Sequence, residues 1–220
     1  MGLLVANRQK YYNGDMSTLI AGSRSNLFSA IYEEYKSKAE ECVTALIPAI
    51  NSNNSITSST FDWNPASPIS ARTLLLSAIN KMQKIDNAIV VVTAPTQIEA
   101  HNLTAPNIEH IVDNYIKGPL FLFREIQIYF RCEKKGTLSL VLQEETENMI
   151  LCSPVSAAWS AFVRSALDTS QSEPYKTLGF NCTVNKLDQI LDFAVFLHKT
   201  IKDTRKIESG KLLKYKKLPF

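Results

Sequence analysis

The chain has 220 residues, of which 45% are hydrophobic and 20% are charged, the balance of one globular domain with a sizeable core. A core of this size needs neither disulfides nor a structural metal to hold together. The formal net charge of +3 is too small to indicate nucleic acid or an anionic membrane as a partner. The chain has only 7 glycines, so loops that cradle phosphate on backbone amides are not expected.

The histidines and cysteines show no spacing typical of a metal site, and the sequence predicts none. The cysteines lack C-x-x-C spacing and have apolar neighbours, which predicts buried free thiols in a reducing compartment: Cys42, Cys132, Cys152 and Cys182. No apolar run approaches the roughly 20 residues that span a bilayer, and Arg8 and Lys10 interrupt any signal peptide. We therefore expect a cytoplasmic protein.

Hydrophobic periodicity predicts strands that alternate with helices in a single domain over residues 17–220, after an extension at 1–16. In chain order we expect a strand at 18–21, a helix from 26, a buried strand at 42–47, a polar loop at 51–60, a short strand or turn at 61–63, a helix from 68, the most apolar strand at 88–92, a long helix at 107–131, a strand at 137–142, a helix at 154–167, a strand at 179–184, a helix at 187–202 and a strand at 211–215.

Local signals support several of these boundaries. Ser67 and Pro68 form a helix start, because serine caps the first turn and proline tolerates its first position. Gly118 and Pro119 predict a kink in the long helix. Alternating strands and helices favour a doubly wound, mostly parallel Rossmann-like α/β sheet of about seven strands with helices on both faces.

Five segments carry local motifs in an informative order, at residues 21–28, 85–95, 117–122, 156–167 and 180–182. In order and spacing they resemble the short-chain dehydrogenase/reductase family, where they correspond to the glycine-rich first turn, the Asn-Asn-Ala-Gly strand, the kinked dimer helix, the helix after the catalytic tyrosine and the Val-Asn-Ala strand. The resemblance covers nearly the whole domain. It implies a cofactor NAD(P) in the crevice at the carboxyl ends of the strands.

The cofactor positions implied by this resemblance are mostly replaced. Gly22 matches the first glycine of the family's turn, but Asn26 and Phe28 occupy the second and third glycine positions. We expect Phe28 to fill cofactor space or to push the loop outward. The acidic residue expected after the second strand is replaced by Pro48 and Ala49.

Asp62 matches the aspartate that contacts the adenine amine in the family. It is either a vestige of nucleotide recognition or a turn-forming aspartate.

The catalytic positions are replaced as well. The resemblance places the catalytic tyrosine at Cys152, the lysine at Ser156 and the serine at Gln143, while the helix asparagine falls on Tyr115, or on Asn114 if the register slips by one. The family's tyrosine transfers a proton to the substrate oxygen, and its lysine lowers the tyrosine pKa. A thiol and a hydroxyl cannot replace them, so the usual reductase chemistry is not expected.

Residues that suggest other chemistry on the same scaffold also have simpler explanations. Cys152 at a helix start is either a nucleophile or a plain buried thiol, and neither His101 nor His110 is placed beside it by the sequence. The acidic run after the strand at 137–142 either binds a cation or is a solvated loop: Glu144, Glu145 and Glu147. The lysine-rich end of the chain is either a protected edge strand or a tail that binds phosphate or lipid.

These observations lead to two functional hypotheses. The first is a pseudoenzyme, a non-catalytic scaffold without a cofactor, that forms a homo-oligomer or pairs with a paralogous subunit through helices 107–131 and 154–167. The small residues and aromatic anchors of such an interface also suit a helix core: Ala157, Ala158, Ala161, Ala166, Phe123, Trp159 and Phe162. The alternative is a divergent NAD(P)-dependent oxidoreductase with a rearranged active site. The segment between Val184 and Leu187 is too short for the family's substrate-covering loop.

Overall fold

A parallel seven-stranded sheet forms the centre of the protein. The computed structural model describes residues 16–47, 60–93, 104–143, 152–184, 186–203 and 207–215, with the backbone alone for residues 152 and 153. The strand order is β3-β2-β1-β4-β5-β6-β7, and every neighbouring pair is parallel. The strands are β1 (Thr18–Gly22), β2 (Cys42–Leu46), β3 (Thr60–Asp62), β4 (Asn87–Thr93), β5 (Thr137–Gln143), β6 (Lys176–Cys182) and β7 (Lys211–Lys214).

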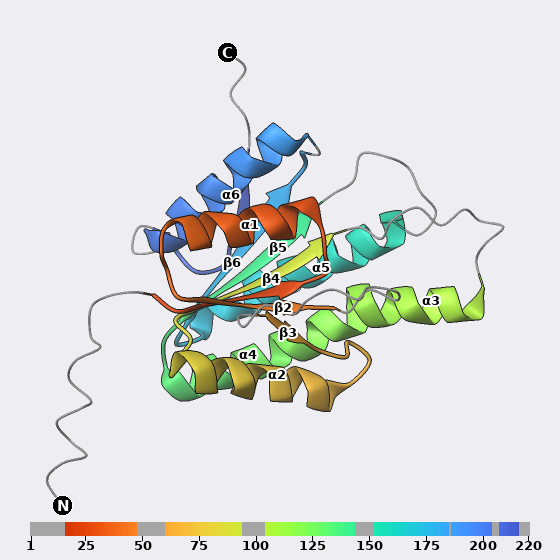
Figure 1. Ribbon diagram of the computed structural model, residues 1–220, viewed down its shortest axis with the longest axis horizontal. Helices are drawn as coiled ribbons and strands as arrows, with labels where there is room; N and C mark the ends of the chain where they lie inside the picture. Colours follow the sequence, from red (N-terminus) through yellow and green to blue (C-terminus); the bar gives the residue numbers. More distant parts are fainter. Residues whose placement is uncertain are drawn as a thin grey trace, which may run out of the picture.

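Helices cover both faces of this sheet. They are α1 (Asn26–Ser37), α2 (Pro68–Met82), α3 (Ala105–Val112), α4 (Gly118–Glu133), α5 (Cys152–Thr169) and α6 (Leu187–Lys202). Figure 1 shows α1 and α6 on one side of the sheet, with α2 and α4 on the other. One apolar core packs α2, α4 and α5 against the sheet, and a second packs α1 and α6 against the opposite face. The doubly wound α/β fold expected from the sequence is therefore confirmed.

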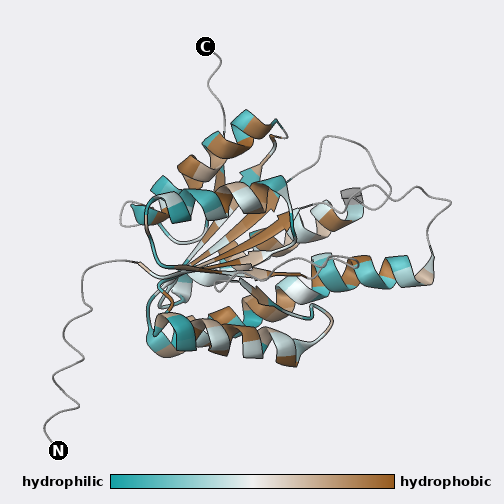
Figure 2. Cartoon of the chain, in the orientation of Figure 1, coloured by the Kyte–Doolittle hydropathy of each residue, from teal (hydrophilic) through white to brown (hydrophobic). Residues whose placement is uncertain are grey.

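The central strands are buried from end to end, which explains their uninterrupted apolar sequence. Every residue of β4 and of β5 is buried. In Figure 2 these strands are hydrophobic along their length, whereas the helices present hydrophilic residues on their outer sides. In the ranges that the structure describes, each helix is too short or too polar to cross a bilayer.

Helix starts agree with the capping signals in the sequence. The Ser67 hydroxyl accepts a hydrogen bond from the Ser70 amide, and Pro68 follows in the first turn of α2, as predicted. The Ser25 hydroxyl caps α1 in the same way by accepting from the Phe28 amide. Each cap satisfies an amide that the helix itself leaves without an acceptor.

The long helix expected at residues 107–131 differs from its prediction. It is divided into α3 and α4 by a π-helical turn over Asp113–Lys117, so the irregularity lies before Gly118 and Pro119. A Cβ atom on Gly118 would lie 2.5 Å from the Pro65 Cβ, so glycine permits the approach of the segment before α2. A π-turn adds a residue to the helical repeat and often marks a functional position.

Two further predictions are wrong in detail. Strand β6 begins at Lys176, three residues before the predicted start at Gly179, because Lys176 pairs with Thr137 of β5 and its amide donates to the Gly136 carbonyl at 2.9 Å. The Lys176 ammonium donates to the Ile207 carbonyl at 3.0 Å. Cys132 is exposed, because the last turn of α4 turns it away from the core, whereas Cys182 is buried as expected and Cys42 is half-buried.

A buried charged cluster connects α1 to α6. His198 Nε2 lies 3.0 Å from a carboxylate oxygen of Glu40, and the Lys202 ammonium donates to the same oxygen at 3.1 Å. The Tyr35 ring packs edge-on against His198 with 4.8 Å between ring centroids. Burial, together with the nearby Glu40 carboxylate, raises the pKa of Tyr35 above its ordinary value, so its hydroxyl stays neutral.

We predict that Glu40→Ala lowers the free energy of unfolding by about 2 to 3 kcal/mol, because it removes the carboxylate that accepts from His198 and Lys202. Glu33→Ala is the matched control, since the Glu33 ion pair with Lys36 is exposed and is worth less than about 0.5 kcal/mol. Urea unfolding followed by circular dichroism measures both. Equal losses in the two variants would contradict a stabilising role for the cluster.

Candidate functional site

The carboxyl ends of the strands bring most of the predicted site positions to one edge of the sheet. Strand β1 lies between β2 and β4, so the chain direction around the sheet reverses there and leaves a crevice. Gly22 ends β1, Asp62 ends β3 and Gln143 ends β5. Cys152 and Ser156 lie in the first turns of α5, and Tyr115 lies in the π-helical turn.

Gly22 is required by the sheet itself. A Cβ atom on this residue would lie 2.3 Å from the Val91 carbonyl oxygen of the neighbouring strand β4. The cavity beside Gly22 has a volume of about 10 Å³ and is lined by side chains that include Ile47, Trp63 and Tyr115. The surviving glycine therefore allows close strand contact and does not by itself indicate a phosphate-binding turn.

Phe28 does not line this cavity, and the alternative expectation, that it pushes the loop outward, stays a prediction. Its side chain is buried in the core beneath α1 and α6, among residues that include Ile20 and Val91, so the expectation that it would occupy cofactor space is wrong. The helix beginning at Asn26 turns this residue toward the sheet. Above the sheet end, the Ser23 and Thr93 hydroxyls lie 3.0 Å apart and hydrogen-bond the loop after β1 to the end of β4.

A larger pocket adjoins Asp62. It has a volume of about 410 Å³, and its polar lining includes Asp62, Asn64, His110 and Asn114. The Trp63 ring is 3% exposed and forms part of its wall, and its indole N–H has no acceptor among the described residues. This is the part of the crevice where the resemblance places an adenine contact.

The π-helical turn contributes a polar pair that the sequence analysis did not single out. Asn114 is 8% exposed, and its amide nitrogen lies 2.7 Å from His110 Nε2. The residues are four apart, so they share one face of the helix, and this spacing was the available signal. Asn114, the alternative to Tyr115, lines both the small cavity and the Asp62 pocket.

The replaced catalytic positions do not form a proton-transfer group among the described side chains. The Gln143 amide donates to the Val184 carbonyl at 3.3 Å, so it ties the end of β5 to the segment after β6. Ser156 is half-buried on α5. The Cys152 side chain lies outside the described residues, as do His101, Pro48, Ala49 and the acidic run Glu144, Glu145 and Glu147.

Cys182 occupies the last position of β6, at the carboxyl end of that strand. Burial raises the pKa of the Cys182 thiol to about 11, and its sulfur donates to the Val184 carbonyl at 3.7 Å. A thiol with this pKa stays protonated near neutral pH and is a poor nucleophile. Within the described ranges, no three His, Cys, Asp or Glu side chains are grouped to hold a metal ion.

Solved structures with this arrangement include short-chain dehydrogenases. An oxidoreductase of this family from Brucella ovis, in complex with a partially ordered NAD, aligns with a TM-score of 0.71 at 9% identity, covering 92% of this chain and 100% of its own. The chain has the short-chain dehydrogenase/reductase fold. A family oxidoreductase from Aeromonas hydrophila aligns with a TM-score of 0.72 at 10% identity, over 92% of this chain and 100% of its own.

A 3-ketoacyl-(acyl-carrier-protein) reductase from Brucella melitensis complexed with NADH also shares this fold. It aligns with a TM-score of 0.69 at 11% identity, over 90% of this chain and 96% of its own. No protein-family model matches the sequence, and no curated protein matches it. The likeness to dehydrogenases therefore lies in the backbone arrangement, and the site must be judged from its side chains.

The described side chains leave little space beside Gly22. Small-molecule sites usually enclose about 300 to 1,000 Å³, whereas the cavity beside Gly22 holds about 10 Å³. Asn26 and Phe28 stand where glycines would let the backbone approach a pyrophosphate. Among the described residues, a larger space of about 410 Å³ lies on the Asp62 side.

We predict that Gly22→Ala lowers the free energy of unfolding by about 1 to 3 kcal/mol, because the added methyl group would press against the Val91 carbonyl. The control is Ser29→Ala on the exposed face of α1, for which we expect a change within about 0.5 kcal/mol. Thermal and urea unfolding measure both. Wild-type stability in Gly22→Ala would show that the strand contact does not require glycine.

Proposed function

We propose that this chain is a non-catalytic protein of short-chain dehydrogenase fold that acts by association with a second copy of itself. The proposal is carried by the identity of the pair at the start of α5, where Cys152 and Ser156 stand four residues apart. Reductases of this fold need a phenol and an ammonium group at these positions. A thiol and an alcohol supply neither the proton donor nor the positive charge that tunes it.

The same edge offers no substitute for that pair among the described side chains. Gln143 is held by the Val184 carbonyl, and the Cys182 thiol has its pKa raised by burial. Asn114 is engaged with His110. These groups tie neighbouring segments together, which supports a structural role for the crevice.

The outer side of α5 supports association. Its exposed residues include Ala157, Ala158, Ala161 and Ser165, which are small enough to let another helix approach closely. The exposed side of the neighbouring helix α4 carries Ile128, which is 41% exposed. A two-fold contact between α4 and α5 of two copies would cover both surfaces.

The aromatic residues considered as interface anchors serve the subunit core. Trp159 and Phe123 are buried, and the Phe123 and Phe162 rings meet edge-on with centroids 4.8 Å apart, joining α4 to α5 within one chain. Ala166 is buried too. The proposed interface is therefore made of small residues and Ile128, and no large aromatic side chain is available to it from this group.

We predict that the wild-type protein elutes in size-exclusion chromatography with light scattering at about twice its chain mass of 24.7 kDa. Ala161→Glu should shift it to the monomer, because an unpaired carboxylate would be buried between the helices. Thr73→Glu, on the exposed side of α2, is the control and should leave the dimer intact. A monomeric wild type would contradict association through this face.

A second candidate function is a divergent NAD(P)-dependent oxidoreductase, favoured by the pocket of about 410 Å³ beside Asp62. In that case NADH or NADPH would bind saturably and increase nicotinamide fluorescence, and Asp62→Ala would weaken the binding. Under the non-catalytic proposal we expect no saturable signal up to millimolar coenzyme, because the crevice beside Gly22 is closed. Coenzyme-dependent reduction of a carbonyl compound by wild-type protein, lost on changing Cys152 or Ser156, would overturn that proposal.

A further inference from the structure

A separate pocket lies near the edge of the sheet opposite β3, between α5 and the strands β6 and β7. Its volume is about 260 Å³. The strand register aligns Leu142 with Asn181, and Asn181 with Lys214, so these three side chains form a row across the ends of β5, β6 and β7. Leu142 belongs to the core on the α5 face of the sheet. The whole row therefore faces α5.

The floor of this pocket is apolar. Gly179 has no side chain, and the space this leaves is taken by apolar side chains of α5 and β7. A Cβ atom on Gly179 would lie 2.9 Å from Leu167 Cδ1, 3.0 Å from Leu212 Cδ1 and 3.1 Å from a Val163 methyl carbon. Leu212 thus reaches across β6 toward α5, and it lines the pocket together with Leu142 and Val163. A ligand bound here would place hydrocarbon on these side chains.

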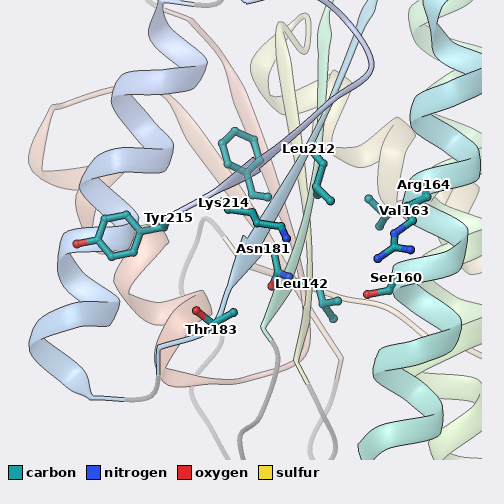
Figure 3. A pocket seen from close by; sticks show the side chains of 10 residues that line it. Leu142, Ser160, Val163, Arg164, Asn181, Thr183, Leu212, Lys214 and Tyr215 are labelled. Atoms are coloured by element: carbon teal, nitrogen blue, oxygen red, sulfur yellow. The ribbon is translucent and has the colours of Figure 1, made fainter. Parts of the chain in front are cut away.

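The rim carries two cations and several neutral hydrogen-bonding groups. Figure 3 shows the Arg164 guanidinium and the Ser160 hydroxyl pointing from α5 toward the sheet, where the Lys214 ammonium lies beside Asn181. Neither Arg164 nor Lys214 forms an ion pair with a carboxylate of the residues that the structure describes. Their charges, one from each wall, therefore converge on the mouth of the same hollow without compensation from described side chains.

We propose that this pocket binds a small amphiphilic anion, with a carboxylate or phosphate head between Arg164 and Lys214 and a short apolar body over Leu142, Val163 and Leu212. Guanidinium and ammonium groups bind both kinds of anion through charge-assisted hydrogen bonds. Ser160 supplies a further donor at the rim. The volume of about 260 Å³ is just below the usual range for small-molecule sites, so the apolar body is short.

This anion pocket is distinct from the pocket beside Asp62 and from the proposed interface on α5. It shares no residue with the pocket beside Asp62, and β3 and β7 are opposite edges of the sheet. It also shares none of the proposed α5 interface alanines. A monomeric protein could bind the anion, and a dimer could form without it, so the two proposals fail independently.

The test is a calorimetric titration of the full chain with sodium hexanoate and with hexyl phosphate, in parallel with inorganic phosphate and 1-hexanol. We expect saturable binding of at least one amphiphilic anion, tighter than that of either control compound. Preference for hexanoate or for hexyl phosphate identifies the head group as a carboxylate or a phosphate. Arg164→Met and Lys214→Met should each raise the Kd about tenfold, the effect of losing one charge-assisted hydrogen bond.

Lys211→Met is the matched control. Lys211 lies on the same strand as Lys214, three residues away and therefore on the opposite face, where it pairs with Glu208 at 3.0 Å. This variant should leave the Kd within about twofold, and all three variants should keep the wild-type melting temperature within a few degrees. Lack of saturation with both amphiphiles, equal binding of 1-hexanol, or equal weakening by Lys211→Met would overturn the proposal.

Discussion

The contact between β1 and β4 determines how the rest of the molecule is arranged. Both strands are buried on both faces, and they lie at the point where the order of strands reverses. Their spacing at the carboxyl end requires that residue 22 has no side chain, because the Val91 carbonyl occupies the place of a Cβ atom. The loop after β1 then crosses the end of β4, where Ser23 meets Thr93. Among the described residues, this packing leaves a cavity of about 10 Å³ beside Gly22.

The fold does not by itself require the catalytic residues that usually accompany it. A doubly wound sheet places the ends of its strands together whatever residues occupy them, and here those ends hold Gln143, Cys182 and Asp62. Two of these side chains share the Val184 carbonyl as acceptor. Hydrogen bonds that fasten one segment to the next stabilise the edge, and here they engage the Gln143 amide and the Cys182 thiol.

The net charge of the protein, +3, is small, but charged side chains are grouped in two contrasting ways. Between α1 and α6 a histidine and a lysine share one buried carboxylate, so the charges compensate within the fold. At β7 the opposite holds, because Arg164 and Lys214 face the same hollow from two walls. The first arrangement stabilises the packing of two helices, whereas the second favours an anion from outside the subunit.

The sequence by itself determined the alternation of strands and helices, the capped start of α2 and the presence of a thiol at Cys152 and a hydroxyl at Ser156, because these are local properties of periodicity, capping and residue identity. It did not determine that Phe28 would point into the core, that Trp159 and Phe123 would pack inside the subunit, or that the helix would contain a π-turn. Those outcomes depend on which face of a helix meets the sheet. Only the tertiary structure could bring Arg164 of α5 opposite Lys214 of β7, because fifty residues separate them and both the packing of α5 on the sheet and the pairing of β7 with β6 are needed.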